Sequence, residues 1–153
     1  MNDGSVGFQA VHIVLVEDDD GHASLVERNL RRAGLMNGFT RLRDGQEAVD
    51  ALLSPNAKLL DATSCVLLLD IKMPRVDGVE VLRQIKADPR TAKLPVIMLT
   101  TTDDPREIDK CYSLGCNVYI TKPVEYDSFV EAVKRLGFFL QVVKLPPNGT
   151  SKP

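Results

Sequence analysis

The sequence has no tryptophan and only three cysteines, and aromatic residues make up 5% of its 153 positions. Cys65, Cys111 and Cys116 are odd in number and contain no Cys-x-x-Cys pair, so their spacing argues against a zinc site. Reduced thiols in a cytosolic protein are the simpler interpretation. We therefore assign no function to the cysteines.

Long apolar runs and a strong charge of one sign are also missing. No stretch approaches the roughly 20 apolar residues that span a bilayer, and the polar first ten residues do not resemble a signal peptide. Lys and Arg number 19 against 21 Asp and Glu, a formal net charge of -2, so no global field points to nucleic acid or an acidic membrane. We expect a cytoplasmic protein that binds neither, with its function located in a specific site.

The length suits one domain with a full hydrophobic core. We expect a flexible N-terminus over residues 1–10, the folded domain over 11–145, and a flexible tail over 146–153 that is rich in Pro, Gly and Ser. No second domain that could bind DNA or catalyse a reaction is recognisable after it.

Apolar runs alternate with helical patterns along this domain, and uninterrupted apolar runs are typical of strands in a parallel sheet. Strands are expected at Val11–Val16, Phe39–Arg43, Cys65–Asp70, Val96–Thr100 and Val118–Thr121. Helices are expected at Ala23–Ala33, after an Asp44 cap, at Val79–Ala87, from an Asp104 cap to near Gly115, and from about Asp127 to Val143. Strand followed by helix, five times over, requires right-handed crossovers and predicts a doubly wound α/β fold with helices on both faces of a parallel sheet.

Chemically active side chains stand where these strands end. They are Glu17 and Asp18 after the first strand, Asp70 at the third, Thr100 at the fourth and Lys122 after the fifth. In open parallel sheets, binding sites form beyond the carboxyl ends of the strands. Several carboxylates without His or Cys favour Mg²⁺ or Mn²⁺ over zinc, and Mg²⁺ bound in this way leaves room for a phosphoryl group.

Four stretches at the strand ends resemble the receiver domain of bacterial two-component response regulators. They are the acid pair "ED" after "IVLV", "LLLDIKMPRVDG", "PVIMLTT" and "YITKP". They follow one another in the family's order, and the resemblance extends over roughly residues 11 to 143. It implies a flavodoxin-like (βα)5 fold whose five-stranded parallel sheet has the strand order 2-1-3-4-5.

The resemblance implies a phosphoacceptor and a metal site. Asp70 would accept a phosphoryl group from a histidine kinase, in a Mg²⁺-dependent reaction. Asp18 would bind the cation directly, Glu17 partly through water, and the backbone carbonyl of Lys72 would supply another ligand. Such a protein promotes its own phosphorylation and dephosphorylation and is not an enzyme with a separate substrate.

The resemblance further implies residues that respond to the phosphoryl group. Thr100 would hydrogen-bond it and Lys122 would pair with it. Tyr119 would turn inward as an aromatic switch, so that the signal is a packing change near the fourth and fifth strands. A cis peptide bond would precede Pro123.

The last helix points to the partners of the protein. It looks similar to that of stand-alone receivers that partner phytochrome-type histidine kinases, and its apolar residues exceed what one buried face requires. We therefore expect a homodimer through the fourth and fifth helices and the fifth strand. The alternative is a helix end buried against the chain's own tail.

Two other functions and an inactive receiver compete with this interpretation. A phosphatase of the haloacid dehalogenase type also uses a strand-end Asp with Mg²⁺, but it needs a second acid two residues later, where Lys72 stands. A receiver-like module that never accepts phosphate is disfavoured by the presence of Asp70, Thr100 and Lys122. A calcium loop matches Asp18, Asp20, Gly21 and Glu27 but has Val16 at its first ligand position and a strand before it. Asp19 and Asp20 are then expected to serve the turn and the helix cap, with Gly21 easing the turn.

Overall fold

The computed structural model describes residues 11–55, 65–122 and 125–143, with side chains as far as residue 136. Its elements are β1 (Val11–Val16), α1 (Asp20–Arg32), β2 (Met36–Leu42), α2 (Gly45–Leu53), β3 (Cys65–Leu69), α3 (Gly78–Ala87), β4 (Val96–Thr100), α4 (Pro105–Leu114), β5 (Val118–Thr121) and α5 (Tyr126–Val143). All neighbouring strands pair in parallel, in the order β2-β1-β3-β4-β5. The predicted fold class and strand order are confirmed.

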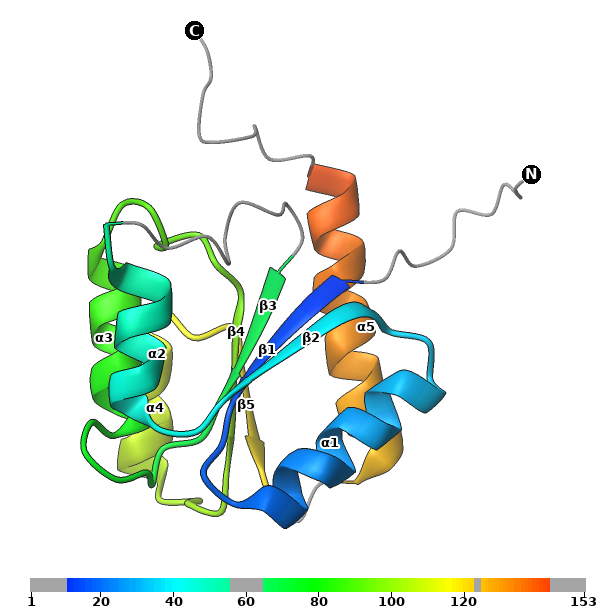
Figure 1. Cartoon of the computed structure of the whole chain (residues 1–153), viewed down its shortest axis with the longest axis horizontal. Coiled ribbons are helices and arrows are strands. Elements are labelled where there is room, and N and C mark those ends of the chain that lie inside the picture. The colour runs from blue at the N-terminus through cyan, green and yellow to red at the C-terminus, as the bar shows by residue number, and fades with distance from the viewer. Residues whose placement is uncertain (1–10, 56–64, 123–124, 144–153) are drawn as a thin grey trace, which may run out of the picture.

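Helices cover both faces of the sheet, α1 and α5 on one and α2, α3 and α4 on the other (Figure 1). Successive strand residues point to opposite faces, so Leu15 joins the core beneath α1 and α5 while Val14 and Val16 join the core beneath α2, α3 and α4. Strand β3 is buried along its whole length. This explains why its sequence is an apolar run and not an alternating pattern.

Aspartate side chains cap four of the helices at their N-termini. Asp19, Asp44, Asp77 and Asp104 each accept a hydrogen bond from a backbone N–H of the first helical turn, at 2.8 to 3.0 Å. A side chain in this position satisfies one of the N–H groups that the helix leaves unpaired. The caps predicted at Asp44 and Asp104 are confirmed.

Several element ends differ from the sequence-based prediction. Helix α1 begins at Asp20, not Ala23, because Asp19 caps it and Gly21 lies within its first turn. Strand β2 runs from Met36 to Leu42, not from Phe39 to Arg43. Gly38 lies against the ring of His12 on β1, where a Cβ atom would come within 2.5 Å of the imidazole Nδ1. A larger residue at position 38 would therefore have to displace the His12 ring.

Strand β3 ends at Leu69, so Asp70 is the first residue after it. The predicted flexible ends and the cis bond before Pro123 lie outside the described residues. Within the described residues, no helix combines the length and the apolar character that crossing a membrane requires.

Candidate functional site

The predicted residues meet at the carboxyl end of the sheet, where α1 begins at the bottom of Figure 1. Backbone hydrogen bonds extend the strand ladder by one step to hold them there. The Asp70 amide donates to the Val16 carbonyl at 3.2 Å, and the Lys122 amide donates to the Thr100 carbonyl at 2.7 Å. Because β1 and β3 are neighbours in the sheet, the acid that follows β1 and the acid that follows β3 lie side by side.

Three carboxylates form the acidic side of the site. One oxygen from each of Glu17, Asp18 and Asp70 lies within 4.8 Å of the others. Glu17 is 1% and Asp70 8% exposed, whereas Asp18 is exposed to solvent. An all-oxygen donor set with one open side fits a hard divalent cation such as Mg²⁺ or Mn²⁺ that keeps some of its water ligands. Lys72 follows Asp70 by two residues in the β3–α3 loop and is exposed.

Lys122 brings a buried positive charge to these acids. Its side chain is 8% exposed, and its ammonium nitrogen lies 2.6 Å from Glu17 Oε1 and 3.4 Å from Asp70 Oδ2. It also lies 3.2 Å from Nδ1 of His22. The ammonium therefore spans the two buried carboxylates, where it offsets part of their mutual repulsion.

The Asp70 carboxylate is held in a defined orientation. The amide of Ile71 donates to its Oδ1 at 2.7 Å, while Oδ2 faces Lys122. The backbone behind it is equally constrained, because a Cβ atom on Gly78 would lie 1.9 Å from the Asp70 carbonyl oxygen. One carboxylate oxygen is thus fixed by the chain and the other is directed into the pocket.

Burial raises the pKa of the Glu17 carboxyl above its usual value. The hydrogen bond and the positive charge of Lys122 oppose this shift, and the nearby charge of Asp70 adds to it. A charged Glu17 is therefore costly to the protein unless a cation is close by.

Thr100 and Tyr119 lie on the neighbouring strands. Thr100 is fully buried at the end of β4, and its hydroxyl accepts a hydrogen bond from the Thr102 amide at 3.4 Å. The half-buried Tyr119 on β5 donates its hydroxyl to the Thr102 carbonyl at 2.6 Å. The backbone of Thr102 thus joins the two side chains for which the family resemblance implies a coupled response.

The calcium-loop alternative fails in the structure. Val16 is fully buried within β1, and the carboxylates of Asp20 and Glu27 pair with arginines instead of converging. Asp19 caps α1, as expected. Of the four consecutive acids at 17–20, only the first two belong to the group that could hold a metal ion.

Two residues near the site were not predicted from the sequence. His22, in the first turn of α1, contacts Lys122, and Arg41 of β2 donates two hydrogen bonds to the Glu17 carbonyl. The first contact joins residues 100 positions apart in the sequence and the second joins residues 24 positions apart, so both depend on strand order and register. The only signal was a pair of arginines, Arg41 and Arg43, near the end of a strand that neighbours an acidic loop.

The three cysteines are buried, as the sequence suggested for Cys65. Burial raises the pKa of Cys111 to about 11 and that of Cys116 to about 12. Thiols with such pKa values are neutral at physiological pH and are poor nucleophiles and metal ligands.

Comparison with known families agrees with this geometry. A family model described as "Response regulator receiver domain" matches residues 13–134. The response regulator Rcp1 of Synechocystis is 32% identical over 135 residues, which cover 88% of this chain and 92% of that protein.

Solved structures give the same result. A response regulator receiver domain from Rhodospirillum rubrum superposes with a TM-score of 0.73 at 45% identity, covering 90% of this chain and 98% of that one. The phosphorylated cyanobacterial phytochrome response regulator RcpA gives a TM-score of 0.71 at 30% identity, covering 88% and 96%. The Mn²⁺-bound form of Rcp1 gives a TM-score of 0.71 at 31% identity, covering 89% of this chain and 99% of that one.

Proposed function

Because the chain belongs to the response regulator receiver family of two-component systems, we propose that Asp70 accepts a phosphoryl group from a histidine kinase. The carrying observation is the pocket that joins Glu17, Asp18 and Asp70 to the buried ammonium of Lys122. In this proposal Glu17, Asp18, Asp70 and the carbonyl of Lys72 hold Mg²⁺, with Mn²⁺ as a possible substitute. A bound cation supplies the positive charge that lets an anionic carboxylate approach an anionic phosphoryl group.

The side chains around Asp70 then have distinct tasks. Its Oδ2, which faces the pocket, forms the new bond to phosphorus while the bond between phosphorus and the donor nitrogen breaks. Ile71 holds the other oxygen through its amide. Lys122 already lies against the acceptor and stabilises charge on the transferred group, and Thr100 takes up a phosphoryl oxygen with its hydroxyl.

The output of this receiver is a change in packing. Thr100 and Tyr119 are joined through the backbone of Thr102, so a movement of Thr100 toward the phosphoryl group changes the hydrogen bond that holds the Tyr119 ring. This shifts the balance between two arrangements of β4, β5 and α4. The protein turns over no separate substrate, and signals through the partners that bind one arrangement better.

Phosphorylation from a small phosphoryl donor tests the acceptor. Wild-type protein incubated with Mg²⁺ and acetyl phosphate should gain the mass of one phosphoryl group, and chelation of the cation should prevent this. Asp70→Asn should abolish the gain. Asp77→Asn, in the same loop, should retain it because asparagine can still cap α3. An unmodified wild type, or modified Asp70→Asn, contradicts the proposal.

We propose a phytochrome-type histidine kinase as the natural donor. The support is the likeness to a phytochrome response regulator over most of both chains. A purified phytochrome kinase should transfer its phosphoryl group to this receiver at least tenfold faster than an unrelated sensor kinase of equal autophosphorylation. Equal rates would remove the phytochrome assignment and leave the acceptor proposal intact.

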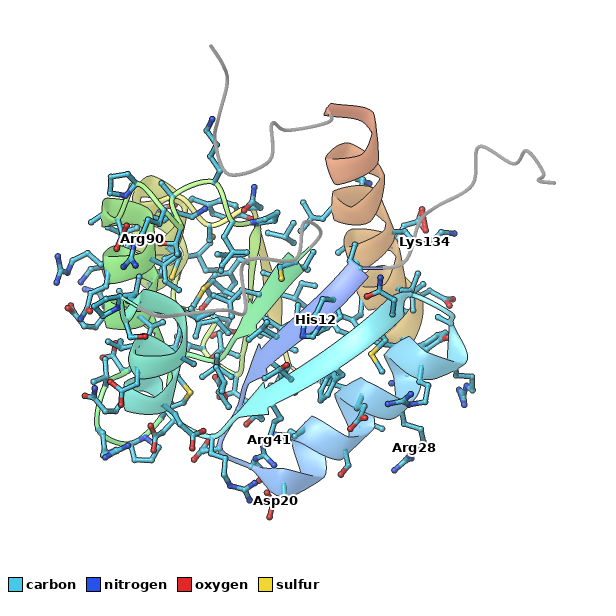
Figure 2. All side chains as sticks on the ribbon, turned by 45° about the horizontal axis from the view of Figure 1, so that its top comes forward. His12, Asp20, Arg28, Arg41, Arg90 and Lys134 are labelled. Atoms are coloured by element: carbon cyan, nitrogen blue, oxygen red, sulfur yellow. The ribbon has the colours of Figure 1, made fainter. Side chains whose placement is uncertain are left out.

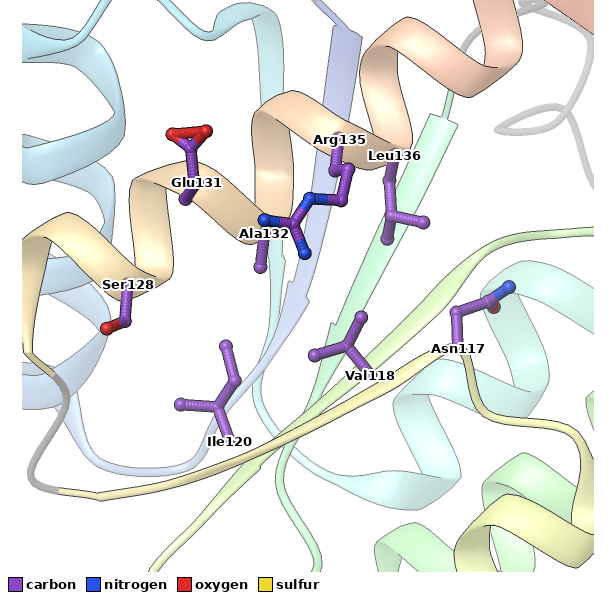
Figure 3. A pocket seen from close by; sticks show the side chains of 8 residues that line it. All are labelled: Asn117, Val118, Ile120, Ser128, Glu131, Ala132, Arg135 and Leu136. Carbon is purple, nitrogen blue, oxygen red and sulfur yellow. The ribbon is translucent and has the colours of Figure 1, made fainter.

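We also propose a homodimer through α4, β5 and α5. Strand β5 is an outer strand of the sheet, and a groove of about 700 Å³ runs between it and α5. Apolar side chains of both elements line it, such as Ile120 of β5 and Leu136 of α5, together with the charged Glu131 and Arg135 of α5 (Figure 3). Opposite charges four residues apart on one helix can pair with the same residues of a second copy across a twofold axis.

Sedimentation at tens of micromolar protein tests the dimer. Arg135→Glu should shift the mass from dimer to monomer, because it places like charges across the interface. Lys134→Glu changes the charge equally at the neighbouring position, which does not line the groove, and should leave the dimer intact. A monomeric wild type, with and without the phosphoryl donor, contradicts this interface.

A further inference from the structure

We propose that Arg41 is a positioning residue for the metal site, because its guanidinium fixes the loop that carries Glu17 and Asp18. The proposal rests on the proposed function in so far as a divalent cation binds to that loop. Figure 2 shows Arg41 and Asp20 close together where β1 passes into α1. Arg41 itself lies on β2, outside the acidic group.

The guanidinium holds two points of the loop at once. Its Nε and Nη2 both donate to the Glu17 carbonyl oxygen, at 2.9 and 2.7 Å, and its Nη1 donates to Asp20 Oδ1 at 2.8 Å. The first point is the peptide unit between Glu17 and Asp18, and the second is the first residue of α1. A planar fork with fixed donor directions restrains both position and orientation, which a lysine ammonium cannot do.

Sheet register explains why the fork reaches this carbonyl. Arg41 lies opposite Leu15, and the Glu17 amide donates to Leu42 in the last backbone bond between the two strands, at 3.0 Å. Beyond Leu42 the chain turns away into α2, so β2 does not continue alongside Glu17. The Arg41 side chain therefore donates the hydrogen bonds to the Glu17 carbonyl that a further residue of β2 would have donated if the strand pairing continued.

Arg43 provides an internal comparison. It also donates to Asp20 Oδ1, at 2.7 Å, but the Glu17 carbonyl is held by Arg41. The Arg43 side chain is 57% exposed, against 18% for Arg41. An exposed ion pair contributes little to stability, whereas a half-buried fork on a backbone carbonyl restrains the chain.

The consequence for the metal site follows from the order of the chain. The peptide unit held by Arg41 sets the direction in which Asp18 leaves the strand, and on the far side the Asp19 amide donates to Glu17 Oε2 at 3.2 Å. The acid pair is thus restrained from both sides before a cation arrives. Restraint of ligands in their binding geometry raises affinity by reducing the entropy lost on binding.

The charge of Arg41 acts in the opposite direction, since a cation next to the site repels Mg²⁺ or Mn²⁺. The two effects can therefore be separated by substitution. Arg41→Lys keeps the charge and loses the fork, whereas Arg41→Gln loses both. Arg43→Gln removes a charge beside Asp20 and leaves the Glu17 carbonyl contact in place.

Mn²⁺ binding to the unphosphorylated protein, measured from the paramagnetic resonance signal of the free ion, gives the first test. Arg41→Lys and Arg41→Gln should each weaken Mn²⁺ binding roughly tenfold, the lower end of what loss of a supporting residue costs a metal site. Arg43→Gln should bind Mn²⁺ as the wild type does or slightly more tightly. Wild-type affinity in Arg41→Lys with tighter binding in Arg41→Gln would mean that only the charge matters, and would overturn the proposal.

Amide hydrogen exchange in the metal-free protein gives a second test that does not depend on the cation. The amides of Asp18 and Asp19 should exchange faster in both Arg41 variants, while the amides of β3 should keep wild-type rates and so show that the fold is intact. Unchanged exchange at Asp18 and Asp19 overturns the inference. A wild type that does not bind Mn²⁺ contradicts the metal part of the proposed function, and the exchange rates still decide whether Arg41 restrains the loop.

Discussion

At the scale of single residues, the pocket combines groups that a folded protein tolerates poorly. Glu17 and Lys122 are almost fully removed from solvent, and the lysine contacts two carboxylates at unequal distances. The raised pKa of Glu17 shows that pairing does not fully compensate its burial. A buried carboxylate with this shift competes for protons with any cation that binds it.

Metal binding should therefore weaken as the pH falls. The folded state binds a proton at Glu17 more readily than the unfolded chain, so this residue stabilises the metal-free fold at low pH, and the contribution is lost as the pH rises through its raised pKa. Cation binding needs the charged form and has the opposite dependence. In Mn²⁺ titrations from neutral pH down to about pH 5, the affinity should begin to fall at a higher pH than it would at a site made of exposed carboxylates.

Glu17→Gln provides the control for this dependence. Its Mn²⁺ affinity should be lower at neutral pH and should change less with pH. A wild-type affinity that stays constant to about pH 5 would contradict the assignment of Glu17 as a metal ligand.

Gly78 is the second residue with a sharp expectation. Its missing side chain allows the backbone of α3 to touch the Asp70 carbonyl, and a methyl group there would overlap that oxygen. Gly78→Ala should lower the free energy of unfolding by about 1–3 kcal/mol, the usual cost of overpacking. It should also slow phosphorylation, because the added methyl group displaces Asp70.

The matched control is Gly34→Ala, after the end of α1. Gly34 has a φ of 70° and no atom within 4 Å of the added Cβ, so only backbone strain of about 1 kcal/mol is expected, with phosphorylation unchanged. Urea unfolding and initial phosphorylation rates measure both variants. A Gly78→Ala protein that is phosphorylated at the wild-type rate would show that the acceptor is not held by this contact.

The predicted site residues could be read from the sequence because each stands at the end of an apolar run, where topology alone gathers them. Arg41 could not, because its role depends on a side chain that crosses from one strand end to the next loop. That crossing is fixed by the register between β1 and β2, which includes an irregularity next to His12. Apolar periodicity reports which residues are buried and contains no information on such a register.

At the scale of elements, α1 shows how a short amphipathic helix is attached to the sheet. Leu30 is fully buried beneath it, whereas Leu25 on the same helix is 49% exposed. Truncation of a buried leucine removes apolar contacts and leaves a cavity, while truncation of an exposed leucine does neither.

Leu30→Ala should therefore lower the free energy of unfolding by about 2–5 kcal/mol, and Leu25→Ala by about 0.5 kcal/mol or less. Urea denaturation followed by circular dichroism measures both values. Equal losses in the two variants would indicate that the helix is not packed as described.

Element types were easier to predict than element ends. The alternation of strand and helix followed from apolar patterns, and the caps at Asp44 and Asp104 from local chemistry. The start of β2 was predicted three residues late; Gly38 lies inside the strand, where its lack of a side chain leaves room for the His12 ring. The start of α1 was missed because Gly21 reads as a turn, although Asp19 caps a helix that includes it.

At the scale of the whole molecule, the buried thiols report on the integrity of the core beneath α2, α3 and α4, which contains all three cysteines. The three cysteines are at most 6% exposed, and burial holds the pKa of Cys111 near 11 and that of Cys116 near 12. The stabilising effect of keeping these thiols protonated is present below the unfolded value of 9.0 and is lost as the pH rises through those folded values.

Ellman's reagent should consequently leave the folded protein unmodified at mildly alkaline pH. After unfolding in urea, all three thiols should react at the rate of an exposed cysteine. Rapid reaction of one thiol in the folded protein would contradict the packing of the core around it.

The strand order has a consequence for how the protein is made. Glu17 follows β1, Asp70 follows β3 and Lys122 follows β5, and the ammonium lies between the two acids only once β5 has paired with β4. On the ribosome, a nascent chain thus holds the two acids long before it holds the lysine that separates their charges. The pocket cannot close until the fifth strand has left the exit tunnel, so a translation intermediate holds the two acids without the cation that pairs with them.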